Sequence, residues 1–148
     1  MTNHGDTAAD RVHASFAKQV AMQTLGAEIA SIADGTVTLQ MPFATNFTQQ
    51  HGFLHAGAMT SLLDSACGYA ALTRMPPDAG VLTIEFAVKL LAPARGRLFR
   101  AEGRVIKGGR RLIFCEGNAF ADEGADRVQI ASISTTMMVV EGRPGIEG

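Results

Sequence analysis

The stretch at residues 51–72, HGFLHAGAMTSLLDSACGYAAL, constrains the fold of this chain more than any other segment. Its Ala, Leu and Met content and its lack of proline predict a helix of about five turns that begins near His55 and ends at Met75-Pro76-Pro77. The helix is apolar on all sides, which is typical of a helix that is buried in the protein interior. We therefore expect it at the centre of the fold.

Four strand-like segments follow this helix and supply a cover for it. They are separated by turn residues at 93–96, 108–109 and 123–124, and their sequences are VLTIEFAVKLLAPA, GRLFRAEGRVIK, GRRLIFCEGNAFAD and RVQIASISTTMMVV. In the first, apolar residues from Leu82 to Leu90 alternate with Thr83, Glu85, Ala87 and Lys89, so one face is wholly apolar and needs a cover. An antiparallel sheet curled around the central helix is the economical packing.

The N-terminal part predicts a helix and a hairpin. From Asp10 to about Leu25, Val12, Phe16 and Val20 recur at every fourth position, as in a surface helix with one buried stripe. The runs AEIASI and TVTLQMPF flank a turn at Ala33-Asp34-Gly35. The predicted order is helix, two strands, buried helix and four strands.

Composition limits the classes of protein and of partner. A chain of 148 residues with 47% hydrophobic content predicts a single domain over residues 1–148, with flexible tails at about 1–9 and 142–148. The formal net charge of −1 disfavours nucleic acid and anionic membranes as partners. The start of the chain lacks a leader pattern, so we expect a cytoplasmic protein. Cys67 and Cys115 are expected to be small core residues.

Two segments, GFLHAGAMTSLLDSACGYAA and TIEFAVKLLAPARG, give the chain a family resemblance. From about Leu25 to Val140 it resembles the hotdog fold and, within it, the phenylacetate-degradation (PaaI-like) type of acyl-CoA thioesterase. The resemblance implies an α+β fold, in which an antiparallel sheet wraps around one long central helix, here with an extra N-terminal helix. It also implies an acyl-CoA substrate, a homo-oligomer (a dimer with shared sites or a dimer of dimers), and no metal or redox cofactor.

The same resemblance implies roles for residues by position. Asp64 corresponds to the acid that acts as nucleophile or general base on the thioester, and Thr83 to a hydroxyl residue that helps to hold the attacking water or the acid. The chain departs from the family at Ala56, where the family has glycine, and at Gln49, where an asparagine is common. Asn46, nearby in the same loop, is a substitute for that asparagine if the loop is shaped differently.

The residues themselves also single out this helix. A buried carboxylate costs several kcal/mol unless it is paired or hydrogen-bonded, so Asp64 requires either a function or a structural partner such as Thr60. His55 and Gly57 are suited to a helix start, where free N–H groups can polarise a carbonyl oxygen. His55 is expected to orient the loop or contact the substrate, unless it is a structural histidine that bonds backbone carbonyl groups.

Helix length predicts that the catalytic site is shared between two chains. Ala56 and Asp64 are separated by about 12 Å at roughly 1.5 Å per residue, whereas attacking and oxyanion-binding groups must both lie about 3 Å from one carbonyl group. The amides of Ala56 and Gly57 must therefore come from a second antiparallel copy of the helix, as a twofold dimer provides.

Further residues are candidates for substrate binding. Met59 and Ser61 lie on the central helix, and Met59 is expected to line an acyl pocket unless it is core filler. The turn Lys107-Gly108-Gly109-Arg110-Arg111 suits a two-residue hairpin at Gly-Gly and brings three cations together for the phosphates of coenzyme A (CoA).

Two other functions remain open. One is hydration or dehydration of an acyl thioester, although no G-D-x-N-P-x-H-like run is present. The other is non-catalytic binding of an acyl or aromatic ligand, with Asp64 as a structural acid. A nucleophilic Cys67 and a catalytic Glu85 are both disfavoured, the first as a buried thiol and the second as an ordinary strand charge.

Overall fold

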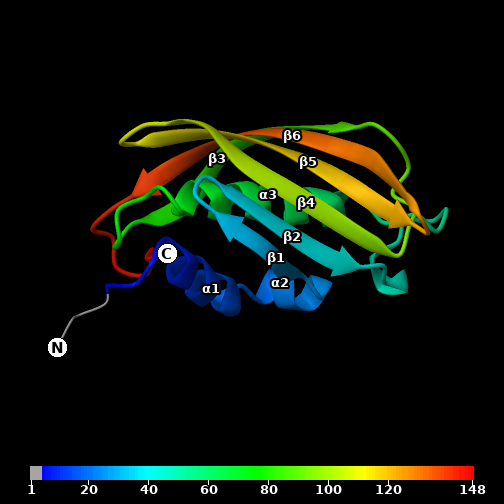
Figure 1. Cartoon of the computed structure of the whole chain (residues 1–148), viewed down its shortest axis with the longest axis horizontal. Helices are drawn as coiled ribbons and strands as arrows, with labels where there is room; N and C mark the ends of the chain where they lie inside the picture. Colours follow the sequence, from blue (N-terminus) through cyan, green and yellow to red (C-terminus); the bar gives the residue numbers. More distant parts are fainter. Residues whose placement is uncertain (1–4) are drawn as a thin grey trace.

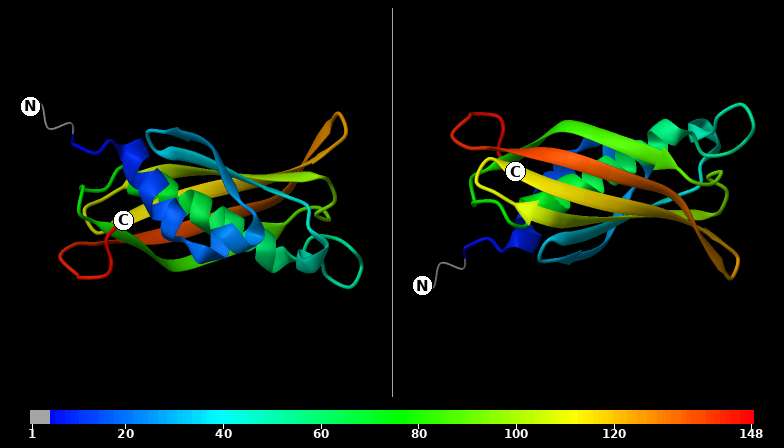
Figure 2. Two further views of the ribbon diagram at one scale, coloured as in Figure 1. Left: turned by 90° about the horizontal axis from the view of Figure 1, so that it is seen from below. Right: turned by 90° about the horizontal axis from the view of Figure 1, so that it is seen from above.

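The computed structural model describes residues 5–148 as a sheet wrapped around a helix (Figure 1). All six strands are antiparallel, in the order β1-β2-β4-β5-β6-β3. Helix α3 lies on the concave side of the sheet, and α1 and α2 lie across α3 on the side away from the sheet (Figure 2). The elements are α1 (Ala8–Lys18), α2 (Val20–Leu25), β1 (Glu28–Ala33), β2 (Thr36–Pro42), the 3-10 helix η1 (Thr45–Phe47), α3 (Ala56–Leu72), β3 (Gly80–Leu90), β4 (Leu98–Gly108), β5 (Leu112–Glu123) and β6 (Asp126–Val140). The predicted hotdog architecture and element order are confirmed.

Helix α3 sits against the sheet because two facing glycines leave room for it. Gly103 of β4 pairs with Gly117 of β5, and a Cβ atom on Gly103 would lie 2.5 Å from the backbone of Ala66. The side chains of Leu62 and Leu63 are fully buried in this contact layer. Burial of each such side chain contributes about 1.5 to 3 kcal/mol.

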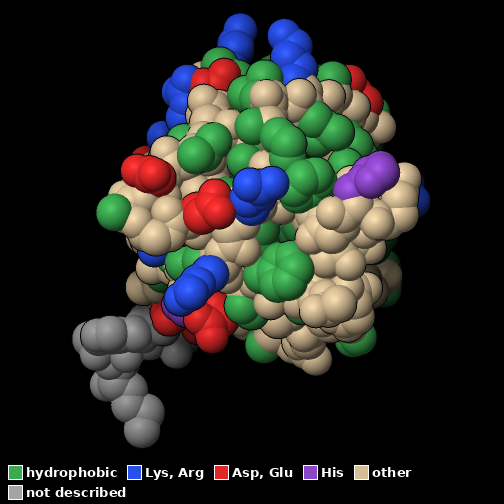
Figure 3. All heavy atoms as spheres, turned by 90° about the vertical axis from the view of Figure 1, so that its right-hand side faces the viewer, with side chains coloured by type: hydrophobic (Ala, Val, Ile, Leu, Met, Phe, Trp, Pro, Cys, Tyr) green, Lys and Arg blue, Asp and Glu red, His purple; other side chains and the backbone are tan. Residues whose placement is uncertain are grey.

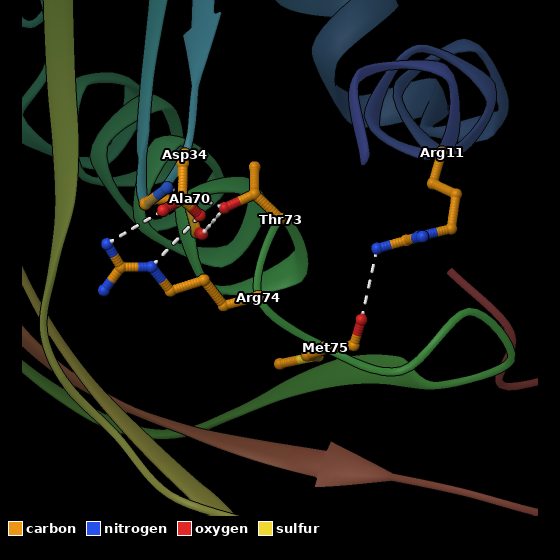
Figure 4. Close-up of polar contacts among 7 residues, drawn as sticks. Arg11, Asp34, Ala70, Thr73, Arg74 and Met75 are labelled. Atoms are coloured by element: carbon orange, nitrogen blue, oxygen red, sulfur yellow. Dashed lines mark hydrogen bonds and ion pairs between the residues drawn. The ribbon is translucent and has the colours of Figure 1, made fainter. Parts of the chain in front are cut away.

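Polar contacts fix the C-terminal end of α3 to the β1-β2 turn (Figure 4). The Thr73 hydroxyl donates to the carbonyl oxygen of Ala70 at 2.7 Å and accepts from the N–H of Gly35 at 2.9 Å. Arg74 Nε lies 3.2 Å from Asp34 Oδ1. The helix is therefore held in register along the sheet, which fixes the position of Asp64.

The predicted single helix from Asp10 to Leu25 is wrong, because the chain breaks at Gln19. Gln19 has an extended backbone (φ −83°, ψ 95°) and separates α1 from α2. As a result Val20 is 68% exposed, whereas Val12 in α1 and Met22 in α2 are buried. The side chain of Gln19 offers a reason for the break, since its Nε2 donates to Ser65 Oγ of α3 at 3.2 Å.

The expectation that one whole face of β3 packs on the helix is also wrong, because of a β-bulge. Thr83 pairs with Met137 and Glu85 with Thr136, so that Ile84 has no counterpart on β6. Such an extra residue shifts the alternation of faces. Thr83 therefore points toward α3, and Glu85 lies on the opposite face, where its carboxylate accepts from Thr136 Oγ1 at 2.7 Å.

The bulge leaves apolar side chains exposed on both faces of β3. Leu82 pairs with the exposed Met138 on the convex face, and Phe86 pairs with the buried Thr135 on the concave face. Leu82 is 46% and Phe86 is 47% exposed. Strand β3 is at the edge of the sheet, so α3 of the same chain covers it incompletely.

The turn between β4 and β5 falls later than the sequence predicts. Gly108 is still in β4, and the N–H of Gly109 donates to the carbonyl oxygen of Leu112 at 2.9 Å. The two residues at the tip are therefore Arg110 and Arg111 rather than Gly-Gly. A second bulge, between Val105 and Lys107, shifts the register of this hairpin.

The predicted N-terminal tail lies only partly within the described residues, and the predicted C-terminal tail lies wholly within them. Residues 1–4 lie outside the described residues, and α1 already begins at Ala8. At the other end, the N–H of Gly148 donates to the carbonyl oxygen of Ala79 at 3.2 Å. No helix within residues 5–148 is long and apolar enough to cross a membrane.

Both cysteines are free and buried, as expected of small core residues. Burial raises the pKa of Cys67, and it raises the pKa of Cys115 to about 11. Both side chains are therefore neutral thiols near neutral pH, which argues against Cys67 as a nucleophile.

Candidate functional site

Asp64 is a half-buried carboxylate in the middle of α3. Its Oδ1 accepts a hydrogen bond from Thr83 Oγ1 of β3 at 2.8 Å, the one hydrogen bond to this carboxylate among residues 5–148. Burial raises the pKa of Asp64, and the bond from Thr83 opposes that rise. Thr60, the structural partner considered from the sequence, instead donates to the carbonyl oxygen of Ala56 at 2.8 Å.

Asp64 and Thr83 face a cavity of about 370 Å³, here called the acid pocket. Gln19 lines it as well, and its Oε1 accepts from the Tyr69 hydroxyl at 3.1 Å. No pattern in the sequence predicts this contact, because glutamine is an ordinary helix residue and the break beside it has no glycine or proline. The remaining lining residues are Ser15, Lys18, Ser65, Gly68, Val81, Leu82 and Glu147.

The start of α3 is capped by the side chain of His55. His55 Nδ1 accepts from the N–H of Gly57 at 2.8 Å, so a neutral ring carries its proton on Nε2. Gly57 leaves space for the ring, because a Cβ atom there would lie 3.0 Å from Nδ1. The Gly57 amide is thus already engaged, and the N–H of Ala56 is the first-turn amide that has no acceptor within residues 5–148.

Ala56 faces a second cavity, of about 510 Å³, here called the amide pocket. Gln49, His55 and Met59 line it too, as do Phe53, Leu54, Leu90, Leu91, Ala92, Pro93, Ala94, Ile130 and Ala131. The Gln49 side-chain oxygen accepts from the N–H of His51, which leaves its Nε2 as a donor for a ligand. The pocket thus combines an apolar wall with donors at the helix start.

Asn46 and Ser61 lie apart from both pockets. They line a third hollow of about 340 Å³ on the other side of His55 and Gly57. Ser61 Oγ donates to the carbonyl oxygen of Gly57 at 2.8 Å. Asn46 therefore lines a different hollow from Gln49.

Of the three cations predicted to bind the phosphates of CoA, only Arg110 and Arg111 line the same cavity. Arg110 and Arg111 line a cavity of about 640 Å³ with Arg143, here called the rear pocket, which lies at the end of the sheet where β6 finishes. Lys107 and Gly108 are in β4 and are not among its lining residues. Arg143 was not singled out from the sequence, since its isolated place near the end of the chain carries no pattern.

The site residues thus form two groups in one chain. Asp64 and Thr83 offer a carboxylate that can activate water or attack directly, and Ala56, His55 and Gln49 offer N–H donors for a carbonyl oxygen. The groups open into separate pockets of the same molecule. Within residues 5–148 there is no cluster of three or more His, Cys, Asp or Glu side chains that could hold a metal ion.

Comparisons with known proteins place this arrangement in a family. The chain is similar to the crystal structure of a thioesterase family protein from Silicibacter pomeroyi, at 45% identity and a TM-score of 0.90, over 91% of this chain and 99% of that one. The PaaI protein from the phenylacetic acid degradation operon of E. coli shares the fold, at 18% identity and a TM-score of 0.81, over 91% and 94% of the two chains.

Curated relatives are more distant. An esterase candidate of Halobacterium salinarum is 34% identical over 57% of this chain and 59% of its own length. One of Saccharolobus solfataricus is 29% identical over 62% of this chain and 65% of its own length. The chain thus spans less than two thirds of the length of these relatives.

The family model of the thioesterase superfamily matches residues 51–128, more than half of the chain, and includes α3 with Asp64 and all of β3. The chain therefore belongs to the thioesterase superfamily.

Proposed function

We propose that this protein is an acyl-CoA thioesterase that hydrolyses a small aryl or a short- to medium-chain acyl-CoA to the free acid and CoA. One observation carries the proposal: Asp64 is half-buried on the central helix, bonded by Thr83 at 2.8 Å, and faces a cavity. A partly buried carboxylate with a single hydrogen bond costs stability, which catalysis by this group would explain. Family membership supports thioester hydrolysis as the use of this acid.

Asp64 acts as general base or as nucleophile. As a base it takes a proton from water while the water oxygen attacks the thioester carbon; the C–S bond then breaks, and the proton passes to the leaving thiolate of CoA. As a nucleophile its oxygen displaces the thiolate, and water hydrolyses the resulting anhydride. Both routes require ionised Asp64 and a donor for the negative oxygen.

The donor comes from the partner subunit in a twofold dimer. Helix α3 runs unbroken from Ala56 to Leu72, so one chain cannot bring its own Ala56 amide and its own Asp64 to one carbonyl group. Ala56 of the partner subunit supplies the N–H, and Gln49 and His55 beside it contact the thioester. The exposed edge strand β3 supports the dimer, since an uncovered apolar edge otherwise invites aggregation.

A dimer of dimers has a second surface available. On the convex face, Leu112 pairs with Met138 and Met138 with Leu82, which makes a row of three exposed apolar side chains across three strands. Such rows mark contact surfaces when they are contiguous. We expect the protein to act in the cytoplasm, where acyl-CoA and CoA are its small-molecule partners.

The test is CoA release, followed with a thiol reagent, over short-chain, medium-chain and aryl acyl-CoAs. Asp64→Asn should lower kcat by at least about 100-fold, because it removes the base or nucleophile and keeps the shape of the side chain. The matched control is Asp78→Asn, at an exposed carboxylate that makes no ion pair within residues 5–148 and lines neither pocket. This control should keep wild-type turnover.

Either of two results would reject the proposal. A folded Asp64→Asn protein with wild-type turnover would show that Asp64 is a structural acid. A wild type without turnover on any thioester would favour the non-catalytic ligand-binding alternative.

A further inference from the structure

Within residues 5–148, some arginines are neutralised by acids and others are not, among them Arg95 and Arg97 near the amide pocket and the three arginines of the rear pocket. Four arginines make ion pairs: Arg74 with Asp34, Arg100 with Asp122, Arg104 with Glu116 and Arg127 with Glu102. Arg95 and Arg97 are exposed and make no ion pair with any of residues 5–148. Unpaired arginines side by side are suited to an anionic ligand.

Arg95 and Arg97 line a cavity of about 500 Å³, here called the terminal pocket, at the end of the sheet where β2 finishes and β4 begins. Figure 3 shows this end of the molecule, where hydrophobic side chains gather in the middle of the face with Lys or Arg side chains beside them. The ring of Phe43 is 39% exposed, and the Phe43 N–H donates to the carbonyl oxygen of Arg97 at 2.9 Å. Phe43 and Arg97 are thus on backbone segments that are paired with each other.

The rest of the terminal pocket has room for a planar group such as a purine ring. Gly52 and Gly124 line it, and a Cβ atom added at either would meet nothing within 4 Å. Glu123 supplies the one carboxylate of the lining, and it can accept from an amino group. Aromatic ring, cations and acceptor together match a purine nucleotide better than a bare phosphate ion.

The terminal pocket is adjacent to the amide pocket. Arg95 Cζ lies 5.4 Å from the ring centroid of Phe53, which lines the amide pocket. The N–H of Leu54 donates to the carbonyl oxygen of Ala94 at 3.1 Å, which ties the loop before α3 to the arginine turn. A ligand that extends from the Ala56 amide through the apolar amide pocket therefore meets Arg95 first.

We propose that the terminal pocket binds the nucleotide end of CoA, with Arg95 and Arg97 on the phosphates and Phe43 against the adenine. This inference rests on the proposed function and locates the phosphates on residues other than those predicted from the sequence. Arg110, Arg111 and Arg143 in the rear pocket lie at the opposite end of the same chain from the Ala56 amide. Substitution of the terminal-pocket arginines and substitution of the rear-pocket arginines are therefore expected to affect CoA binding differently.

The test compares one acyl group on CoA and on pantetheine, which lacks the nucleotide. Arg95→Ala and Arg97→Ala should each raise KM for the acyl-CoA about 10-fold and leave KM for the acyl-pantetheine and both kcat values within about twofold. Phe43→Leu should raise KM for the acyl-CoA by a smaller factor. Arg104→Ala, an ion-paired arginine on the convex face, is the matched control and should keep wild-type values.

Direct binding separates this inference from the proposed function. Calorimetry with CoA itself should give a Kd about 10-fold weaker for Arg95→Ala and Arg97→Ala than for wild type, whether or not any thioester is hydrolysed. Wild-type affinity in both variants would overturn the inference. So would a loss of affinity confined to the double variant Arg110→Ala/Arg111→Ala, which would place the phosphates in the rear pocket.

Discussion

Two opposing effects act on the pKa of Asp64. Burial raises its pKa, and the hydrogen bond from Thr83 lowers it by favouring the charged form. In the proposed function the base or nucleophile must be ionised, so we expect activity to fall as pH drops through this pKa. We therefore expect Thr83 to be a positioning residue, whose hydrogen bond also keeps Asp64 ionised at lower pH than burial alone would allow.

Replacement of Thr83 should move the acid side of the pH profile. Thr83→Val keeps the shape of the side chain and removes the hydroxyl, so the pKa of Asp64 rises further and the fall of kcat/KM begins at higher pH. We expect a kcat/KM about 10-fold lower at neutral pH, recovered in part as pH increases. Thr83→Ser, which retains the hydroxyl, should keep the wild-type profile. An unshifted acid limb in Thr83→Val would show that the bond does not tune the acid.

The break between α1 and α2 is the element that couples the N-terminal helices to the site. Gln19 bonds Ser65 Oγ at 3.2 Å and the Tyr69 hydroxyl at 3.1 Å, and both partners are buried on α3 beside the acid pocket. The extended backbone at Gln19 turns its side chain inward, which a continuous helix with Val20 on the buried stripe would not do.

Loss of the Gln19 amide should destabilise the fold. Gln19→Leu leaves two buried hydroxyls without their partner, at a cost of about 1 to 3 kcal/mol in the free energy of unfolding, and should lower Tm by roughly 3 to 8 °C. Gln23→Leu, in the next helix, loses only an exposed bond to the carbonyl oxygen of Ala17 and should change stability by less than about 0.5 kcal/mol. Thermal unfolding of both variants checks this. Equal Tm values would mean that the break has another cause.

Sequence pattern predicted the elements and missed their interruptions. The central helix, the β1-β2 hairpin and four later strands follow from apolar periodicity and turn residues, which are local properties. The break at Gln19 and the bulge at Ile84 depend on contacts with α3 and β6 far away in sequence. Asp64 is a candidate from the sequence because it is a carboxylate within an apolar helix, which is a local property, whereas Gln19 and Arg97 are candidates only because the fold places them beside cavities.

At the scale of the whole molecule, the acid pocket and the amide pocket belong to one chain, and under the proposed function they contribute to two different sites. Strand β3 is an uncovered apolar edge, and α3 presents Gly57, Thr60, Ser61 and Asp64 outside the buried core. In the proposed dimer, we expect pairing of two chains along this side to cover the edge and to bring each Asp64 toward the helix start of the other chain. A single chain is therefore expected to fold with intact pockets and to lack turnover.

Mixed dimers test directly whether the Ala56 amide and the Asp64 carboxylate of one site come from different chains. Ala56→Pro removes one N–H at the first helical position, where proline is tolerated, and the extended backbone of His55 (φ −62°, ψ 139°) accepts a following proline. Ala56→Pro should lower kcat by about 100-fold or more through loss of the oxyanion donor, and Ala56→Gly, which keeps the N–H, is its control. Ala56→Pro and Asp64→Asn should each be nearly inactive as homodimers.

Unfolding and refolding the two variants together forms hybrid dimers, in which one site combines the intact Ala56 amide of one chain with the intact Asp64 of the other. Random pairing makes about half of the dimers hybrid with one working site each, so activity should recover to roughly a quarter of the wild-type value. CoA release before and after mixing measures it. If each chain housed its own complete site, every hybrid would still carry one defect per site, and mixing would restore nothing. Recovery thus requires that the amide and the acid act across the subunit boundary.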